Sequence, residues 1–143
     1  MKVLLRVVLF FICTIGYSQN WQTNFSTAKT KALASNKNIL LVFTGSDWCA
    51  PCIKLDKSVW QSDVFKTYSE KLILVKADFP KKKQNQLTEE MTKQNQDLAS
   101  IYNPEGVFPL VVVLDKSGKV LGKESYKNIS PNDYILLIDS FIK

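Results

Sequence analysis

The sequence predicts an α/β fold in which a central mixed β-sheet is flanked by helices on both faces. Short and continuously apolar runs, such as Ile39–Thr44, are typical of strands that are buried on both sides of a sheet. These runs alternate along the chain with segments in which apolar residues recur at helical spacing. The 143 residues amount to one domain, which can bury a core without support from a metal or a disulfide scaffold.

The first predicted elements are a helix over about residues 25–35 and the strand Ile39–Thr44. Asn36 is expected to end the helix, because asparagine is common just past a helix C-terminus. Gly45 is expected to end the strand, because glycine weakens a strand interior and favours turns.

Two helical segments and a second buried strand come next. One helix begins near Cys49, and Pro51 is tolerated in its first turn because the missing N–H would be unpaired there. The other begins at Ser62 or Asp63, either of which could cap it. The apolar run Leu72–Ala77 is the next buried strand.

A polar stretch, Lys81–Gln96, is rich in Lys, Gln, Asn and Glu, a composition that is also compatible with disorder. We favour a connection that leads into an amphipathic helix ending before Asn103. The apolar stripe of this helix is expected to consist of Leu87, Met91, Leu98 and Ile101.

The last part of the chain is predicted to form a hairpin and a helix. The strand Leu110–Leu114 is joined by the turn Asp115–Gly118 to its partner over residues 119–126. Ser130 then caps the final helix, with Pro131 at its first position. The apolar residues of this helix recur at helical spacing and are Tyr134, Leu137, Ile138 and Phe141.

The N-terminus has the pattern of a secretory signal peptide. The basic residues Lys2 and Arg6 precede an apolar run of 11 residues, Val7–Tyr17, and small residues follow near its end. We expect cleavage after Ser18, which leaves a mature domain over residues 19–143 in the periplasm or outside the cell. An uncleaved anchor is the alternative, but the run is shorter than the ~20 apolar residues that a membrane helix needs.

Charge and composition exclude several classes of function. The net charge of +6 falls to +4 when Lys2 and Arg6 are removed, and Arg6 is the only arginine. A nucleic-acid partner is not expected, since arginine is the usual residue for bidentate contacts with bases. The lysine cluster Lys81–Lys83 is interpreted as a solvated loop. The absence of histidine removes Ser–His and Cys–His nucleophile pairs and histidine metal sites.

The cysteine pattern carries the chemistry. The chain has three cysteines, and Cys13 is removed with the signal peptide, which leaves Cys49 and Cys52. They are spaced Cys-x-x-Cys at the expected start of a helix, where backbone amides and the helix dipole favour a thiolate on Cys49. Cys52 lies one turn further on, close enough to resolve a mixed disulfide, and Pro51 stiffens the turn between them. The alternatives are a zinc half-site, for which further ligands are missing, or an inert buried pair.

With these residues in place, the chain resembles the thioredoxin superfamily from about Lys37 to its C-terminus. The resemblance rests on Trp48–Cys52 after a buried strand, on Val107–Pro109 before the next strand, and on the hairpin turn Asp115–Lys119. It implies a thioredoxin fold, with Cys49 as nucleophile and Cys52 as resolving cysteine.

The resemblance also implies roles for three residues around the cysteines. Pro109 would follow a cis peptide bond and face the cysteine pair. Phe108 would supply the backbone edge that pairs with an extended substrate segment. Trp48 would pack beside the sulfur atoms.

The chain departs from cytoplasmic thioredoxins at several positions. Phe43 replaces a buried acid that helps to deprotonate the resolving cysteine, and Lys57 replaces a proline that kinks the active-site helix. We therefore suggest that Lys76 or Asp78, on the next strand, tunes Cys52. The segments around Gly45 and Trp60 are more similar to exported relatives, in particular to the terminal domain of the membrane thiol–disulfide interchange reductase.

The predicted function is reduction of disulfides in exported proteins or peptides, with a membrane electron donor upstream and the protein acting as a monomer. No cofactor and no metal are expected. One alternative is an oxidase or isomerase of the same fold. Another is a binding or copper-handling module that uses the thiols without turnover.

Overall fold

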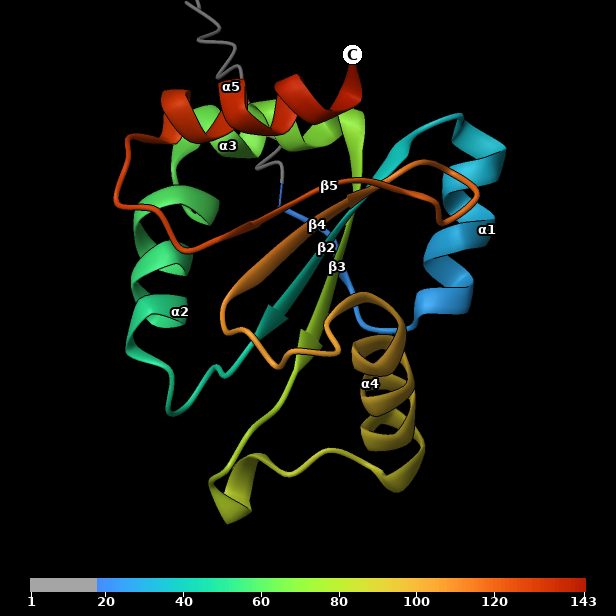
Figure 1. Cartoon of the computed structure of the whole chain (residues 1–143), viewed down its shortest axis with the longest axis vertical. Coiled ribbons are helices and arrows are strands. Elements are labelled where there is room, and N and C mark those ends of the chain that lie inside the picture. Colours follow the sequence, from blue (N-terminus) through green and yellow to red (C-terminus); the bar gives the residue numbers. More distant parts are fainter. Residues whose placement is uncertain (1–17) are drawn as a thin grey trace, which may run out of the picture.

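The computed structural model describes residues 18–143 as one α/β domain built on a five-stranded sheet (Figure 1). The strand order is β1-β3-β2-β4-β5; β1, β3 and β2 run parallel, β4 is antiparallel to β2, and β5 is antiparallel to β4. The predicted mixed sheet is therefore confirmed. The strands are β1 (Trp21–Gln22), β2 (Asn38–Thr44), β3 (Leu72–Asp78), β4 (Leu110–Leu114) and β5 (Val120–Ser125). The predicted signal peptide, with Cys13, lies outside the described residues except for Ser18.

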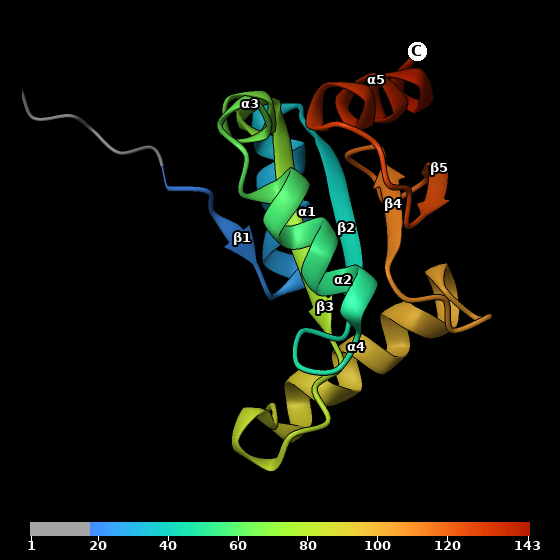
Figure 2. The same cartoon turned by 90° about the vertical axis from the view of Figure 1, so that its left-hand side faces the viewer.

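Helices cover both faces of this sheet, as predicted. In Figures 1 and 2, α2, α3 and α5 lie against one face, and α1 and α4 lie against the other. The helices are α1 (Phe25–Ser35), α2 (Ala50–Leu55), α3 (Asp63–Tyr68), α4 (Glu89–Tyr102) and α5 (Pro131–Ile142). Short segments of other helical type are the π-helix η1 (Asp56–Trp60) and the 3-10 turns η2 (Ser69–Lys71) and η3 (Lys83–Asn85).

The predicted helix ends are confirmed at three places. Asn36 follows α1 in the left-handed conformation, with φ of 53°, which asparagine tolerates better than most residues. The side chain of Ser62 accepts a hydrogen bond from the Phe65 N–H and caps α3. Ser130 caps α5 in the same way. These ends follow from local hydrogen bonding, which is why the sequence predicts them.

Strand β2 is the centre of the domain. Its residues from Ile39 to Thr44 are all buried, as the apolar run predicts. Successive side chains alternate between two cores: Leu40 and Val42 point towards α2, α3 and α5, and Ile39, Leu41 and Phe43 point towards α1 and α4. Burying each of these large side chains contributes about 1.5–3 kcal/mol, so this strand is a major source of stability.

The structure differs from the sequence prediction in two elements. The two-residue strand β1, which pairs with β3, was not predicted, because so short a segment has no detectable periodicity. The stripe predicted for α4 is confirmed at Leu98, which is buried, but Ile101 is 67% exposed and Leu87 precedes the helix. The buried face of α4 consists of Leu98 together with Asn95 and Tyr102. Asn95 donates a hydrogen bond to the carbonyl of Asp78, and a polar core residue of this kind is invisible to apolar periodicity.

No helix within residues 18–143 is both long enough and apolar enough to cross a membrane.

Candidate active site

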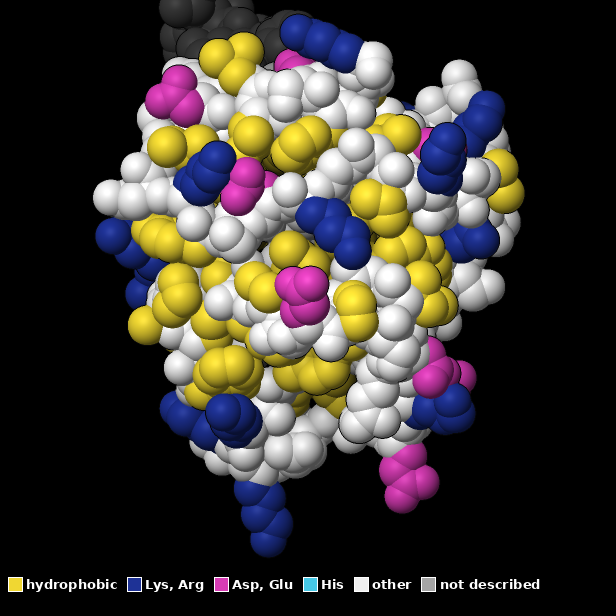
Figure 3. Space-filling view, in the orientation of Figure 1, with side chains coloured by type: hydrophobic (Ala, Val, Ile, Leu, Met, Phe, Trp, Pro, Cys, Tyr) yellow, Lys and Arg dark blue, Asp and Glu magenta, His cyan; other side chains and the backbone are white. Residues whose placement is uncertain are grey.

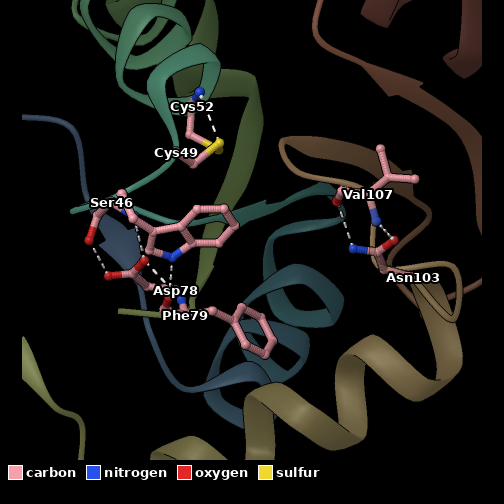
Figure 4. The surroundings of a disulfide bond; sticks show 8 residues. Ser46, Cys49, Cys52, Asp78, Phe79, Asn103 and Val107 are labelled. Atoms are coloured by element: carbon pink, nitrogen blue, oxygen red, sulfur yellow. Dashed lines mark hydrogen bonds between the residues drawn. A yellow bond between two sulfur atoms is a disulfide. The ribbon is translucent and has the colours of Figure 1, made fainter. Parts of the chain in front are cut away.

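Cys49 and Cys52 form a disulfide where β2 leads into α2 (Figure 4). Their Cα atoms are 5.2 Å apart, and both residues are buried, with 4% and 3% exposure. Cys49 is the N-cap of α2, and its Sγ accepts a hydrogen bond of 3.4 Å from the Cys52 N–H. A backbone donor aimed at this sulfur, at the positive end of a helix, stabilises negative charge on it.

The turn before Cys49 depends on Gly45. Its carbonyl accepts hydrogen bonds from the N–H groups of Trp48 and Cys49, at 3.3 and 2.9 Å. A Cβ atom at position 45 would lie 2.3 Å from the Trp48 indole, so only glycine leaves room for this ring. The indole Nε1–H donates to the carbonyl of Phe79 at 2.7 Å. Trp48 is thereby held at the surface beside the cysteine pair, with 38% of its area exposed.

The Val107–Pro109 segment lies beside this turn. The Phe108–Pro109 peptide bond is cis, as the resemblance implies. Because Phe43 pairs with Leu110 across β2 and β4, Pro109 lies at the end of the sheet where β2 runs into the cysteine motif. The Phe108 ring contacts the Trp48 indole edge to face, with centroids 5.6 Å apart.

Asn103, at the end of α4, holds this segment, and sequence reasoning missed it. It is 3% exposed; its Nδ2 donates to the Val107 carbonyl and its Oδ1 accepts from the Val107 N–H, both at 2.9 Å (Figure 4). The only sequence signal is an asparagine at a predicted helix end, which is ordinarily interpreted as a cap.

A cavity of about 180 Å³ lies beside Cys52, large enough for water. The two residues suggested to tune Cys52, Lys76 and Asp78, both line it. The Lys76 ammonium pairs with the Asp56 carboxylate at 2.9 Å, and Asp78 accepts hydrogen bonds from the Ser46 N–H and hydroxyl. The lining residues are Thr44, Ser46, Cys52, Ile53, Asp56, Lys57, Lys76 and Asp78.

Asp56 is the second residue that sequence reasoning missed. It begins the π-helical segment η1, in which the Gln61 N–H donates to the Asp56 carbonyl. Segment η1 also contains Lys57, which stands where thioredoxins carry a kinking proline. Segment η1 continues directly from α2, and short π-helical segments are common at functional sites. Phe43, by contrast, belongs to the core on the side of α1 and α4. The carboxylates that line the cavity beside Cys52 therefore come from η1 (Asp56) and from β3 (Asp78), and not from β2.

Comparison with known proteins agrees with this geometry. The sequence model of the thioredoxin-like family matches residues 20–116, which is more than half of the chain. The chain belongs to the thioredoxin-like family. Among relatives, disulfide bond reductase DsbH of Chlamydia pneumoniae is 35% identical over 124 residues, which cover 86% of this chain and 72% of DsbH.

Solved structures confirm the thioredoxin fold. A structure titled DsbH oxidoreductase superposes with a TM-score of 0.80 at 32% identity, covering 87% of this chain and 85% of that one. The oxidised C-terminal domain of DsbD from Neisseria meningitidis has a TM-score of 0.58 at 16% identity, covering 86% and 98%. At this low identity, the similarity to the DsbD domain shows only that the two proteins share a fold. Family, fold and the Cys49–Cys52 disulfide together identify this thioredoxin-like protein as a thiol–disulfide oxidoreductase.

Within residues 18–143, no group of three Cys, Asp or Glu side chains is arranged to hold a metal ion.

Proposed function

We propose that the protein reduces disulfide bonds of exported polypeptides, with Cys49 as nucleophile and Cys52 as resolving cysteine. The observation that carries this proposal is the Cys49–Cys52 disulfide, in which the N-cap sulfur accepts the Cys52 N–H. The reducing direction is supported by the 35% identity with a relative named disulfide bond reductase. The Ala-Pro pair between the cysteines, close to the Gly-Pro of reducing thioredoxins, favours the same direction.

The reaction starts from the dithiol form. The Cys49 thiolate attacks one sulfur of the substrate disulfide, forms a mixed disulfide and expels the other substrate sulfur as a thiolate, which takes up a proton. The Cys52 thiolate then attacks the Cys49 sulfur and releases the second substrate thiolate. The substrate gains two electrons and two protons, and the protein ends as the disulfide seen here. A dithiol donor must reduce it again, and a membrane protein is our candidate for that donor.

The cavity beside Cys52 offers a route for its proton. Cys52 must lose a proton before it attacks, and burial opposes that loss. Asp56 and Asp78 provide carboxylates in the same cavity, which is large enough to hold water. Lys76, paired with Asp56, supplies a positive charge that favours the Cys52 thiolate. Asp56 is thus proposed to tune Cys52 together with Lys76 and Asp78.

The substrate is proposed to bind as an added strand beside Pro109. The Asn103 side chain already occupies both backbone polar groups of Val107. The backbone edge left for an extended substrate is therefore that of Phe108, next to the cis bond. Trp48 and Phe108 would contact side chains of the substrate, and Pro51 would shape the turn between the cysteines.

We further propose that the mature protein begins after Ser18 and acts as a monomer in the periplasm or outside the cell. The basic start and apolar run of the N-terminus support export. The mature domain contains no arginine, the residue best suited to nucleic-acid recognition, so a nucleic-acid partner is not proposed.

The redox potential tests the direction of the reaction. Equilibration of the Cys49–Cys52 couple with glutathione should give a potential near that of thioredoxin, about −270 mV. A value near about −120 mV, that of strong oxidants, would contradict the reductase assignment and favour the oxidase alternative.

Variants of the two cysteines test their roles. Cys52→Ser should accumulate mixed disulfides with its substrates, because the resolving thiol is missing. Cys49→Ser should form none and should lose insulin reduction. Full insulin reduction by Cys49→Ser would reject the mechanism and leave a binding function.

A further inference from the structure

The lysine cluster Lys81–Lys83 lies beside the proposed substrate site. The Nζ of Lys81 lies 3.9 Å above the centre of the Trp48 ring, a cation–π contact. Since Trp48 directly precedes Cys49, this contact places a positive charge next to the active-site motif. The sequence alone suggested only a solvated loop.

Asp47 holds this loop in place. Its Oδ1 accepts a hydrogen bond from the Lys81 N–H at 3.0 Å. Its Oδ2 accepts from the Lys82 N–H at 2.9 Å and from Asn85 Nδ2 at 3.0 Å. The hydrogen bond from the Lys81 N–H is the largest of several causes that lower the pKa of Asp47. A loop tied at three points to the active-site turn presents its charges in a defined position.

An aromatic surface continues from Trp48 beside the loop. Phe108 contacts Trp48 with ring centroids 5.6 Å apart, and Phe79 contacts Phe108 at 5.3 Å. Phe79 in turn rests on buried Phe43. In Figure 3, hydrophobic side chains on this face lie directly above lysines at the lower end of the molecule, where Figure 1 places the loop with η3.

Within residues 18–143, the ammonium groups of this loop form no salt bridge, and the charge of Lys82 also acts on the Asp47 carboxylate. The carboxylate of Asp47 is bound to backbone and amide N–H groups. The three lysines and the Asp47 carboxylate together carry a net charge of +2. Such a surface is complementary to a segment that combines carboxylates with an apolar side chain.

We propose that the Lys81–Lys83 loop is a specificity element that selects disulfide-containing polypeptide segments with acidic residues flanking the reactive cysteine. An apolar side chain of the substrate rests on Trp48 and Phe108 while the flanking carboxylates meet the lysines. This inference rests on the proposed function and names the substrate class of the same site. Asp47 acts as a positioning residue for the loop.

Two matched peptides test this preference. Each is a disulfide-linked dimer with one cysteine per chain, flanked by glutamates in one peptide and by glutamines in the other. Each is mixed with the pre-reduced protein in stoichiometric amounts, and the free peptide thiol is measured after rapid acid quenching. We expect the glutamate peptide to react about tenfold faster at low salt, and the ratio to fall towards one at high salt.

Two triple variants assign the preference to the loop. In Lys81→Gln/Lys82→Gln/Lys83→Gln the ratio between the peptides should fall to about one. The control is Lys71→Gln/Lys116→Gln/Lys119→Gln, which removes the same charge. These exposed lysines flank the start of β3 and the end of β4, at the opposite end of the sheet from Cys49. The control should keep the tenfold ratio.

Several results would overturn the inference. Equal rates in the unmodified protein, an unchanged ratio in the loop variant, or a lost ratio in the control variant would each do so. Loop-dependent binding to vesicles of anionic phospholipid, with equal rates for the two peptides, would assign the lysines to a membrane surface instead. Reaction with neither peptide would contradict the proposed function itself, so the two failures are distinguishable.

Discussion

The side chain of Asn103 accepts a hydrogen bond from the Val107 N–H and donates one to the Val107 carbonyl. This contact joins the end of α4 to the segment that carries Phe108 and the cis bond to Pro109. The segment that is proposed to bind substrate is therefore positioned by a buried amide from another element.

Replacing Asn103 by alanine should destabilise the protein by about 2–4 kcal/mol. Two buried hydrogen bonds are lost, and both polar groups of Val107 are left without their partner. Urea unfolding measures the change. The rate of insulin reduction at a temperature where the variant is fully folded should also fall, because Phe108 is no longer held. A loss of less than about 1 kcal/mol would contradict this role.

Replacing Gly45 by alanine should displace the Trp48 indole, since the new Cβ would lie 2.3 Å from the ring. The hydrogen bond from Trp48 to the Phe79 carbonyl would be lost with it. We expect a cost of about 1–3 kcal/mol, as for other overpacked sites, and altered tryptophan fluorescence. The double variant Gly45→Ala/Trp48→Phe serves as control. It should be less destabilised than the sum of its two single variants, and strict additivity would show that the two positions do not clash.

Replacing Asp56 and Lys76 singly should move the resolution step in opposite directions on the pH scale. In Asp56→Asn the Lys76 ammonium loses its carboxylate partner and favours a Cys52 thiolate, so resolution should reach half its maximal rate at lower pH. In Lys76→Met the Asp56 carboxylate is unpaired and should move that midpoint to higher pH. Stopped-flow decay of a preformed mixed disulfide on Cys49 gives the profile. A merely structural pair would move neither midpoint, and shifts in the same direction would contradict the proposed cavity chemistry.

The variant Tyr134→Phe, which removes the Tyr134 hydroxyl, should increase the free energy of unfolding by about 1 kcal/mol. Tyr134 is fully buried against Trp60, and within residues 18–143 its hydroxyl has no hydrogen-bond partner. Tyr68→Phe is the matched control, because the Tyr68 hydroxyl donates to Asp139 at 2.7 Å. The control should be destabilised by about 1 kcal/mol. Thermal and urea unfolding measure both changes. Equal effects of the two variants would contradict the conclusion that the Tyr134 hydroxyl is buried without a hydrogen-bond partner.

The loop held by Asp47 should stay in place in mild acid. Hydrogen bonds led by that from the Lys81 N–H lower the pKa of Asp47 from its usual 3.8. Asp47 therefore binds a proton more readily when the loop is released than when the loop is held. The contribution of Asp47 is therefore present above about pH 3.8 and is lost as the pH falls through its lowered pKa. Protection of the Lys81 and Lys82 amides from hydrogen exchange should persist at about pH 5. In the Asp47→Asn variant, protection of these two amides should be reduced even at neutral pH. Equal protection in the variant and the unmodified protein would show that Asp47 does not hold the loop.

Local features of the chain could be predicted from the sequence. The burial of β2, the caps Ser62 and Ser130, and the start of a helix at the cysteine pair depend on residues a few positions apart. Cys49 and Cys52 are themselves only three positions apart. The resemblance to a known family added the cis bond before Pro109 and the order of the motifs.

The sequence by itself thus determined the fold class, the helix ends and the cysteine pair, because these follow from short-range hydrogen bonding and apolar periodicity. Tertiary structure alone decided what surrounds the pair. Asp56 pairs with Lys76, which lies 20 positions further along the chain, and Asp47 accepts a hydrogen bond from the Lys81 N–H, 34 positions further along. The position of a polar side chain in the sequence does not indicate which distant residue it contacts, because that contact forms only when strands and helices pack. For that reason the cavity beside Cys52 and the held lysine loop are properties of the folded domain.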